Sequence, residues 1–156
     1  MTHLVYVSHT FGTLTHEKVR ELASDSAARN QQIDVTGVMV YGNQHVMQLL
    51  EGDLHVVHAL FQKIARDRRH HHVTRIAFYP VPQRQFANWS MELINLDDHS
   101  RLDHERLRDI LSRQAAVPTH DATAYARLTE ELLEEFRKQL MPNLNAVPRD
   151  TCSLSA

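Results

Sequence analysis

A predicted β-hairpin with a predicted helix on each side is the feature that most constrains the fold. Two apolar runs, 35–41 and 45–50, flank Gly42–Asn43, residue types that allow the positive φ angles of a tight turn. Apolar residues at helical spacing predict one helix from about Thr15 to Arg29 and a second helix that begins after a capping Asp53. A strand pair between two amphipathic helices is typical of an α+β domain.

Three further runs rich in β-branched and aromatic residues predict strands at 3–8, 73–80 and 89–96. Asn30 is expected to end the first helix, because asparagine tolerates the left-handed conformation found at helix C-termini. The order is β-α-β-β-α-β plus a fifth strand. It predicts a ferredoxin-like α+β fold, in which two helices lie side by side on one face of a mostly antiparallel sheet.

The sequence changes character after about residue 98. Residues 99–141 contain two short amphipathic patterns, which predict a helical extension that must pack on the sheet or on another subunit. Residues 142–156 have little to bury, and we expect this tail to be disordered. The predicted domain organisation is therefore a folded domain at 1–98, the helical extension and the tail.

Composition restricts the class of protein. The net charge of −2 and the isoelectric point near 6.6 give no electrostatic reason to expect binding to nucleic acid or to an anionic membrane. No apolar run is long enough to span a bilayer, and the N-terminus lacks the features of a signal peptide. Cys152 is the single cysteine and cannot form an internal disulfide. These features favour a cytoplasmic protein.

Twelve histidines are present, and three of them are consecutive at 70–72. Consecutive residues do not share a face of a helix or of a strand, and no cysteine or carboxylate accompanies them at ligand spacing. A solvated turn is the interpretation that this pattern favours, and no metal site is predicted.

Gln48 is a polar residue in an otherwise apolar predicted strand. In the ferredoxin-like order the first and third strands are adjacent, so Tyr6 and Gln48 can be cross-strand neighbours. An amide donates and accepts at once, so Gln48 could bridge the phenol and a planar heterocycle. The alternative is a structural hydrogen bond to Tyr6 or to the backbone, and Asn30 alone is explained equally well as a helix cap.

Five segments, taken together, resemble the BLUF domain, a blue-light sensor that binds flavin non-covalently. In chain order they read LVYVS, SAARNQQIDVTGVMVY, HVMQLLEG, IARDRRHHHV and RQFANWSM, within the first 98 or so residues. The resemblance implies that Tyr6 donates an electron and then a proton through Gln48 when the flavin is excited. Gln48 would then be rotated or tautomerised, and its new bond to the flavin C4 carbonyl would shift the absorption to the red. Asn30 would hold the C4 carbonyl and N3 side of the ring.

The resemblance also implies roles for residues around the ring. Arg69 and His70 match positions near the other polar atoms of the flavin and its ribityl-phosphate portion, and a solvated helix end is the alternative for both. Arg29 flanks the ring, and Ser26 could tune the Gln48 network or bond its own helix. Ser8 follows the key tyrosine, with a structural role as an equal alternative. The expected cofactor is FAD, although contacts to the ring do not distinguish FAD from FMN.

Trp89 and Met91 match the pair whose placement the family ties to signalling. As alternating strand residues the two would share a face, so an exchange between them requires a change of register or packing. We expect a photoreceptor and not an enzyme. It would signal to a protein partner or to a second copy of the chain through its C-terminal helices. The alternatives are an acylphosphatase-like hydrolase on the same fold and a non-photoactive interaction module.

Overall fold

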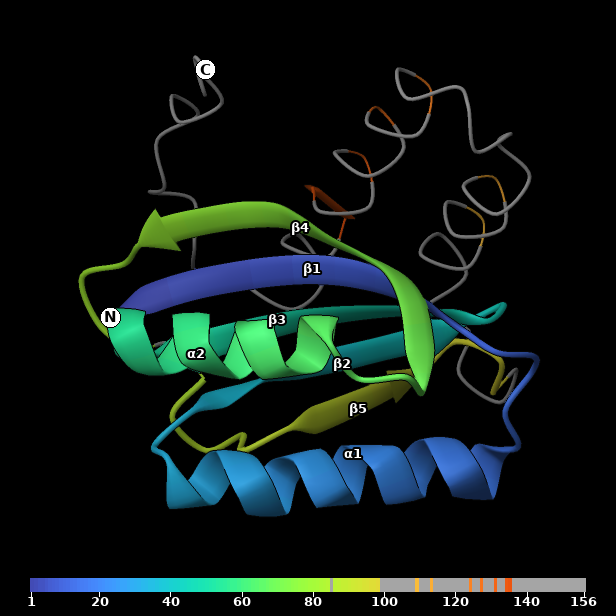
Figure 1. Cartoon of the computed structure of the whole chain (residues 1–156), viewed down its shortest axis with the longest axis horizontal. Coiled ribbons are helices and arrows are strands. Elements are labelled where there is room, and N and C mark those ends of the chain that lie inside the picture. Colours follow the sequence, from blue (N-terminus) through green and yellow to red (C-terminus); the bar gives the residue numbers. More distant parts are fainter. Residues whose placement is uncertain are drawn as a thin grey trace.

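The computed structural model describes residues 1–84 and 86–98, together with seven separate positions further along the chain. In this part, five strands form one sheet in the order β4-β1-β3-β2-β5, and two helices accompany it (Figure 1). Neighbouring strands are antiparallel except for β2 and β5, which are parallel. The prediction of a ferredoxin-like α+β fold with a fifth strand is confirmed. The elements are β1 (Thr2–Thr10), α1 (His16–Gln32), β2 (Thr36–Gly42), β3 (His45–Gly52), α2 (Leu54–Ala65), β4 (His70–Pro80) and β5 (Glu92–Asn95).

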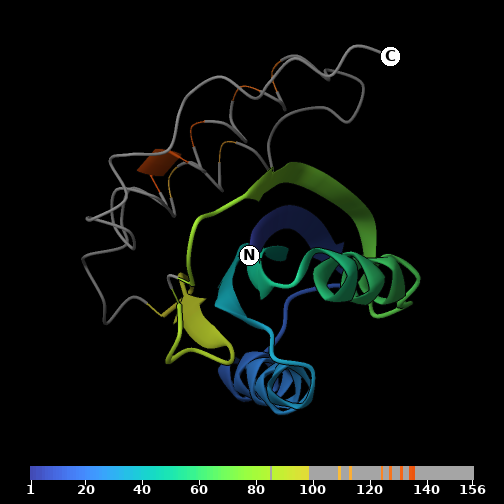
Figure 2. The same ribbon diagram turned by 90° about the vertical axis from the view of Figure 1, so that its left-hand side faces the viewer.

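Both helices lie on the same face of the sheet, as the end-on view shows (Figure 2). The first helix, α1, packs against β2 and β5, whereas α2 packs against β1, β3 and β4. Alternate residues of β1 point to opposite faces, so Leu4 and Tyr6 join the helix-side core while Val5 and Val7 join a second core on the other face. Because the sheet is covered on both faces, almost every residue of β1 and β3 is buried, including several polar ones.

The helix starts follow the sequence, but the end of α1 does not. Thr15 and Asp53 cap the two helices, and their side chains accept hydrogen bonds from the backbone N–H groups of the first turn. The prediction that Asn30 ends α1 is wrong, because the helix continues to Gln32. Asp34 takes the left-handed conformation instead, with φ at 53°. The side chain of Asn30 is therefore free to point into the protein, where it is 3% exposed.

The hairpin turn lies one residue later than predicted. Gly42 is the last residue of β2, and the two turn residues are Asn43 and Gln44, with φ angles of 48° and 65°. Positive φ at both positions is the geometry of the turn that matches the twist of a two-residue hairpin. The backbone N–H of Thr10 donates to the Gln44 carbonyl and joins this turn to the end of β1.

Two strand boundaries also differ from the prediction. The consecutive histidines 70–72 begin β4 and do not form a solvated turn, since His70 pairs with Thr10 and His71 pairs with His9.

At the other edge of the sheet, β5 is shorter than expected, and Trp89 and Met91 precede it. They do not share a face. Trp89 packs against the core on the face away from the helices, and Met91 packs against both helix-side clusters.

The predicted helical extension and tail lie largely outside the described residues. The seven described positions beyond residue 98 are all helical. Within them, Arg113 Nε donates to Asp109 at 3.0 Å, and Arg113 Nη2 donates to Glu131 at 2.8 Å. Among the described residues, no helix combines the length and the apolar character needed to cross a bilayer. The positions are Asp109, Arg113, Ala124, Arg127, Glu131, Glu134 and Glu135.

Candidate functional site

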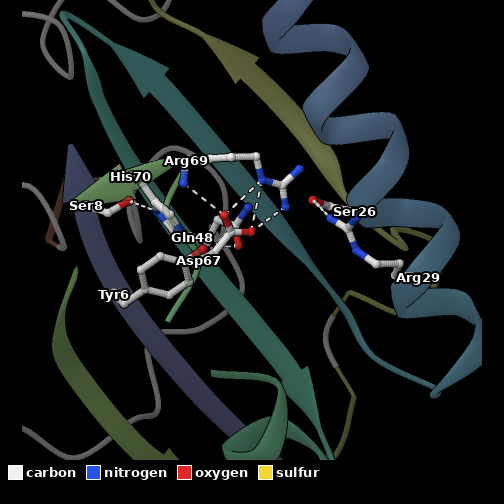
Figure 3. Close-up of polar contacts among 8 residues, drawn as sticks. All are labelled: Tyr6, Ser8, Ser26, Arg29, Gln48, Asp67, Arg69 and His70. Carbon is white, nitrogen blue, oxygen red and sulfur yellow. Dashed lines mark hydrogen bonds and ion pairs between the residues drawn. The ribbon is translucent and has the colours of Figure 1, made fainter. Parts of the chain in front are cut away.

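Tyr6 and Gln48 are directly opposite each other on the two central strands, as the sequence predicts. The Tyr6 hydroxyl donates a hydrogen bond to Gln48 Oε1 at 2.5 Å (Figure 3). Both side chains are buried, with exposed fractions of 2% and 5%. The ring of Tyr6 also contacts Phe61 of α2, at 5.6 Å between centroids. The β1–β3 register and this ring contact therefore fix the phenol against the amide.

The environment of Tyr6 keeps its phenol protonated. Burial raises the pKa of Tyr6 far above its ordinary value of 10.0, and the negative charge of Asp67 raises it further. The positive charge of Arg29 acts in the opposite direction. At neutral pH the hydroxyl is thus a hydrogen-bond donor, and the Gln48 carbonyl oxygen is its acceptor.

Asn30 connects α1 to the segment that precedes β5. Its Nδ2 donates to the carbonyl oxygen of Ser90 at 3.0 Å. The neighbouring carbonyl, that of Trp89, accepts from the backbone N–H of Gly37 in β2 at 2.8 Å. Gly37 also approaches β3 closely, because a Cβ atom at this position would lie 2.0 Å from the Leu49 carbonyl oxygen. The segment at 89–91 is therefore held by both a helix and a strand.

Ser8 and His70 form a second polar contact on the helix side of the sheet. The Ser8 hydroxyl and His70 Nδ1 are 2.9 Å apart, and Ser8 is fully buried. Burial lowers the pKa of His70, an effect that the charge of Asp67 partly offsets. The contact joins β1 to the start of β4, close to the Tyr6–Gln48 pair (Figure 3).

Arg69 is bound to an acidic neighbour. Its Nε and Nη2 atoms donate to the Asp67 carboxylate at 3.0 and 2.5 Å, and its backbone N–H donates to the same group at 2.9 Å. These bonds lower the pKa of Asp67 to about 2. Arg69 extends toward α1, where Arg29 donates to Ser26 at 3.3 Å (Figure 3). Within residues 1–84 and 86–98, no hydrogen bond joins Ser26 to Gln48.

Two polar atoms on this side of the sheet lack partners. Within residues 1–84 and 86–98, neither Gln48 Nε2 nor Asn30 Oδ1 has a hydrogen-bond partner. One is a donor and the other an acceptor, and both belong to side chains that are at least 95% buried. Apolar residues flank them on both helices: Val19 and Ala23 on α1, and Ile64 on α2. The arrangement suits a planar heterocycle with polar atoms along one edge.

The model of the family described as sensors of blue light using FAD matches residues 1–92. The chain belongs to the BLUF family. Its BLUF domain is a blue-light sensor, and FAD is the flavin that the family uses. Gln48, Asn30 and the flanking apolar side chains fit the polar edge and the apolar body of an isoalloxazine ring.

Relatives of this BLUF domain occur in larger proteins. The chain is 35% identical over 103 residues to the blue light- and temperature-regulated antirepressor BluF of Escherichia coli K12, which covers 66% of this chain and 26% of that protein. It is 28% identical over 116 residues to the photoactivated adenylate cyclase subunit beta of Euglena longa, covering 74% of this chain and 13% of the cyclase subunit. The chain thus spans about a quarter or less of the length of these two relatives.

Solved structures share the fold. A bacterial light-regulated adenylyl cyclase is 30% identical with a TM-score of 0.65, over 84% of this chain and 36% of the cyclase chain. BlrB, a BLUF protein in its dark state, is 23% identical with a TM-score of 0.61, over 83% of this chain and 95% of BlrB. The BLUF domain itself is a sensor, and the cyclase structure shows that such a domain also occurs in the same chain as an enzyme.

Sequence reasoning missed a buried polar network on the face away from the helices. His3 Nε2 lies 2.9 Å from Glu51 Oε1, and both side chains are fully buried. The other carboxylate oxygen accepts from Thr36 Oγ1 and from the backbone N–H of Phe86, each at 2.9 Å. Glu51 therefore ties β1, β2 and β3 to the loop that leads to Trp89. The signal was available, because the register that pairs Tyr6 with Gln48 also pairs His3 with Glu51.

Proposed function

We propose that Tyr6 and Gln48 form the light-responsive element of this sensor and that the signal leaves through residues 89–95. The observation that carries the proposal is the hydrogen bond from the buried Tyr6 hydroxyl to Gln48 Oε1, combined with a Gln48 Nε2 that has no partner within the described residues. One end of the amide is fixed by protein, and the other is available to a cofactor.

When bound, the flavin would supply the absorption of blue light and an acceptor for one electron. Tyr6 is the donor, because a neutral phenol that loses an electron also loses its proton readily to an acceptor. That acceptor is Gln48 Oε1, 2.5 Å from the hydroxyl oxygen. Return of the electron and the proton leaves Tyr6 unchanged, whereas Gln48 can be left with its donor and acceptor ends exchanged. The amide then presents a different hydrogen-bonding atom to each neighbour.

Exchanging one or two buried hydrogen bonds changes the relative free energy of two conformations by about 1–3 kcal/mol, which is enough to shift the equilibrium between them. The sheet offers a direct route for this change. Gln48 pairs with Met39 of β2, and Met39 pairs with Leu93 of β5, so a single cross-strand row joins Tyr6 to the edge of the sheet. Met91 lies two residues before Leu93 and packs against both helix-side clusters. This row supports β5 and the segment before it as the output.

The receiver of the signal is a protein partner or a second copy of the chain, bound through the C-terminal extension. Two relatives, an antirepressor and a photoactivated adenylate cyclase subunit, are much longer than the region that they share with this chain. In the extension, Arg113 bonds both Asp109 and Glu131, which supports two helical segments packed together. Sedimentation of the illuminated and the dark protein tests self-association. A difference supports a second copy, and identical profiles favour a different partner.

The test of the light-responsive element is a difference spectrum, illuminated minus dark, of the FAD-bound protein. Gln48→Leu should retain the flavin and lose the red shift, because leucine cannot exchange donor and acceptor. Gln62→Leu is the matched control, since Gln62 is exposed on α2 and the chemical change is the same. A normal red shift in Gln48→Leu would refute the proposal. A wild-type protein that stays colourless with excess FAD would favour a non-photoactive interaction module.

A further inference from the structure

Four histidines from three strands gather on the face of the sheet away from the helices. His9 of β1 pairs with His45 of β3 on one side and with His71 of β4 on the other. The ring centroids lie 4.2 Å apart for His9 and His45 and 5.5 Å apart for His9 and His71. His72 is the fourth member, with its ring centroid 5.4 Å from that of His9. Residues far apart in the sequence thus form one imidazole cluster.

A backbone irregularity brings His71 and His72 to the same place. Successive strand residues normally point to opposite faces. Here the β1–β4 register shifts between Val7 and His9, and His72 has a φ of 50°. As a result, the Nδ1 atoms of His71 and His72 are 2.7 Å apart. The assumption that consecutive histidines cannot face one another is therefore wrong at this bulge.

The geometry of the cluster points to a metal ion. We propose that His9, His71 and His72 form a binding site for a divalent transition metal ion, with Zn²⁺ as the expected occupant. One nitrogen from each ring lies within 4.8 Å of the others. Zn–N bonds of about 2.0–2.1 Å place ligand nitrogens in tetrahedral sites roughly 3.4 Å apart, so side-chain rotation suffices to close the site. Three ligands leave a fourth position for water or another donor.

The surroundings prepare the nitrogen atoms for a cation. His9 Nε2 and His45 Nε2 are buried and have no hydrogen-bond partner within the described residues. His45 Nδ1 is 2.7 Å from the carbonyl oxygen of Asn43, so it carries the proton and leaves Nε2 with its lone pair. The His45 ring packs against that of His9 at an interplanar angle of 58°, and His45 acts as a positioning residue for it. The unpartnered His9 Nε2 is therefore a nitrogen that a metal ion could bind together with His71 and His72.

The ligand set indicates the class of metal ion. Imidazole binds a metal ion through a ring nitrogen that carries no proton. A set of imidazole nitrogens favours Zn²⁺, Ni²⁺ or Cu²⁺ over Ca²⁺ and Mg²⁺, which prefer oxygen ligands.

The experiment is a calorimetric titration of the FAD-bound, full-length chain with Zn²⁺. The wild type should bind one ion at this site, and Mg²⁺ should not compete. His71→Gln removes a half-buried ligand and His72→Asn an exposed one, and each should raise the dissociation constant more than about tenfold. His58→Gln is the matched control, because it removes an exposed histidine of α2 that lies outside the cluster. The flavin absorption spectrum reports that each variant is folded.

A second measurement identifies the ligands. Co²⁺ bound by histidine nitrogens has visible bands on the long-wavelength side of the flavin absorption. The bands should appear in the wild type and in His58→Gln, and they should be lost in His71→Gln. Binding in His71→Gln and His72→Asn that equals the wild type would overturn the proposal. Absence of saturable Zn²⁺ binding in the wild type would overturn it equally.

Discussion

The side-chain amide of Asn30 donates a hydrogen bond to the carbonyl oxygen of Ser90 at 3.0 Å and so joins α1 to the segment before β5. The two residues are 60 positions apart in the sequence. Asn30 faces the same side of the sheet as Gln48, and Ser90 lies between Trp89 and Met91. A single bond therefore connects the candidate flavin contacts with the candidate output.

Asn30→Ala should lower the free energy of unfolding by about 1–3 kcal/mol, because it leaves the Ser90 carbonyl without its partner. Urea unfolding with and without FAD measures the change, and the FAD-free value isolates the bond to Ser90. Ser24→Ala is the control on the exposed side of α1 and should change stability by less than about 0.5 kcal/mol. Equal effects of the two variants without FAD would show that the bond contributes nothing.

Tyr6 should make the protein less stable at alkaline pH. Its pKa is raised above 10.0 by burial, so the unfolded chain loses the phenolic proton near pH 10 while the folded chain keeps it. The contribution of the protonated Tyr6 phenol to the free energy of unfolding is fully present below pH 10 and is lost as the pH rises above 10. Urea midpoints between about pH 9 and pH 11 should fall more steeply in the wild type than in Tyr6→Phe. Parallel curves would contradict the burial of a protonated phenol.

Asp67 should compete with flavin for Arg69. The Arg69 hydrogen bonds lower the Asp67 pKa to about 2, so the carboxylate is charged and paired above about pH 4 and is released only as the pH falls toward 2. Asp67→Asn should free the guanidinium and tighten FAD binding several-fold in a fluorescence titration. Glu17→Gln makes the same charge change at the exposed start of α1. Equal FAD affinities of Asp67→Asn and Glu17→Gln would contradict this prediction. They would mean either that Arg69 does not contact the flavin or that the affinity for FAD depends only on net charge.

Met91 and Trp89 should differ in their effect on flavin binding. Met91 packs against the clusters beneath both helices, whereas Trp89 packs beside Phe86 on the other face, at 5.6 Å between ring centroids. Met91→Ala should raise the FAD dissociation constant, because it removes apolar contact next to the candidate ring position. Trp89→Phe should leave that constant within about twofold. The opposite order would mean that Trp89 faces the flavin.

Local sequence patterns predicted which elements form, but long-range pairing decided where they end. Periodicity identifies α2 and its Asp53 cap because both depend on residues within a few positions of each other. The start of β4 at His70 depends on pairing with Thr10, which no local pattern reports. Asn30 is similar, since its side chain is used for a distant carbonyl and not for the helix end.

The site was predictable to the extent that strand order was predictable. Once β1 and β3 are known to be adjacent, the register places Tyr6 opposite Gln48. The same register places His3 opposite Glu51 and His9 opposite His45, two pairs that were not anticipated. The positive φ of His72 could not be read from the sequence, because this conformation is uncommon for any residue other than glycine, even for histidine, which adopts it more often than most.

The hydrogen bond from the Phe86 N–H to Glu51 limits how far the candidate output segment, residues 89–95, can move. On one side Phe86 is bonded to the carboxylate of the fully buried Glu51, and on the other Glu92 is paired with Val38 in the sheet. Between them the Trp89 carbonyl is bonded to Gly37 and the Ser90 carbonyl to Asn30. A light-driven displacement of this segment must therefore break or replace at least one of these bonds. The distance over which the segment can move is thus limited by anchors in α1, β2 and β3.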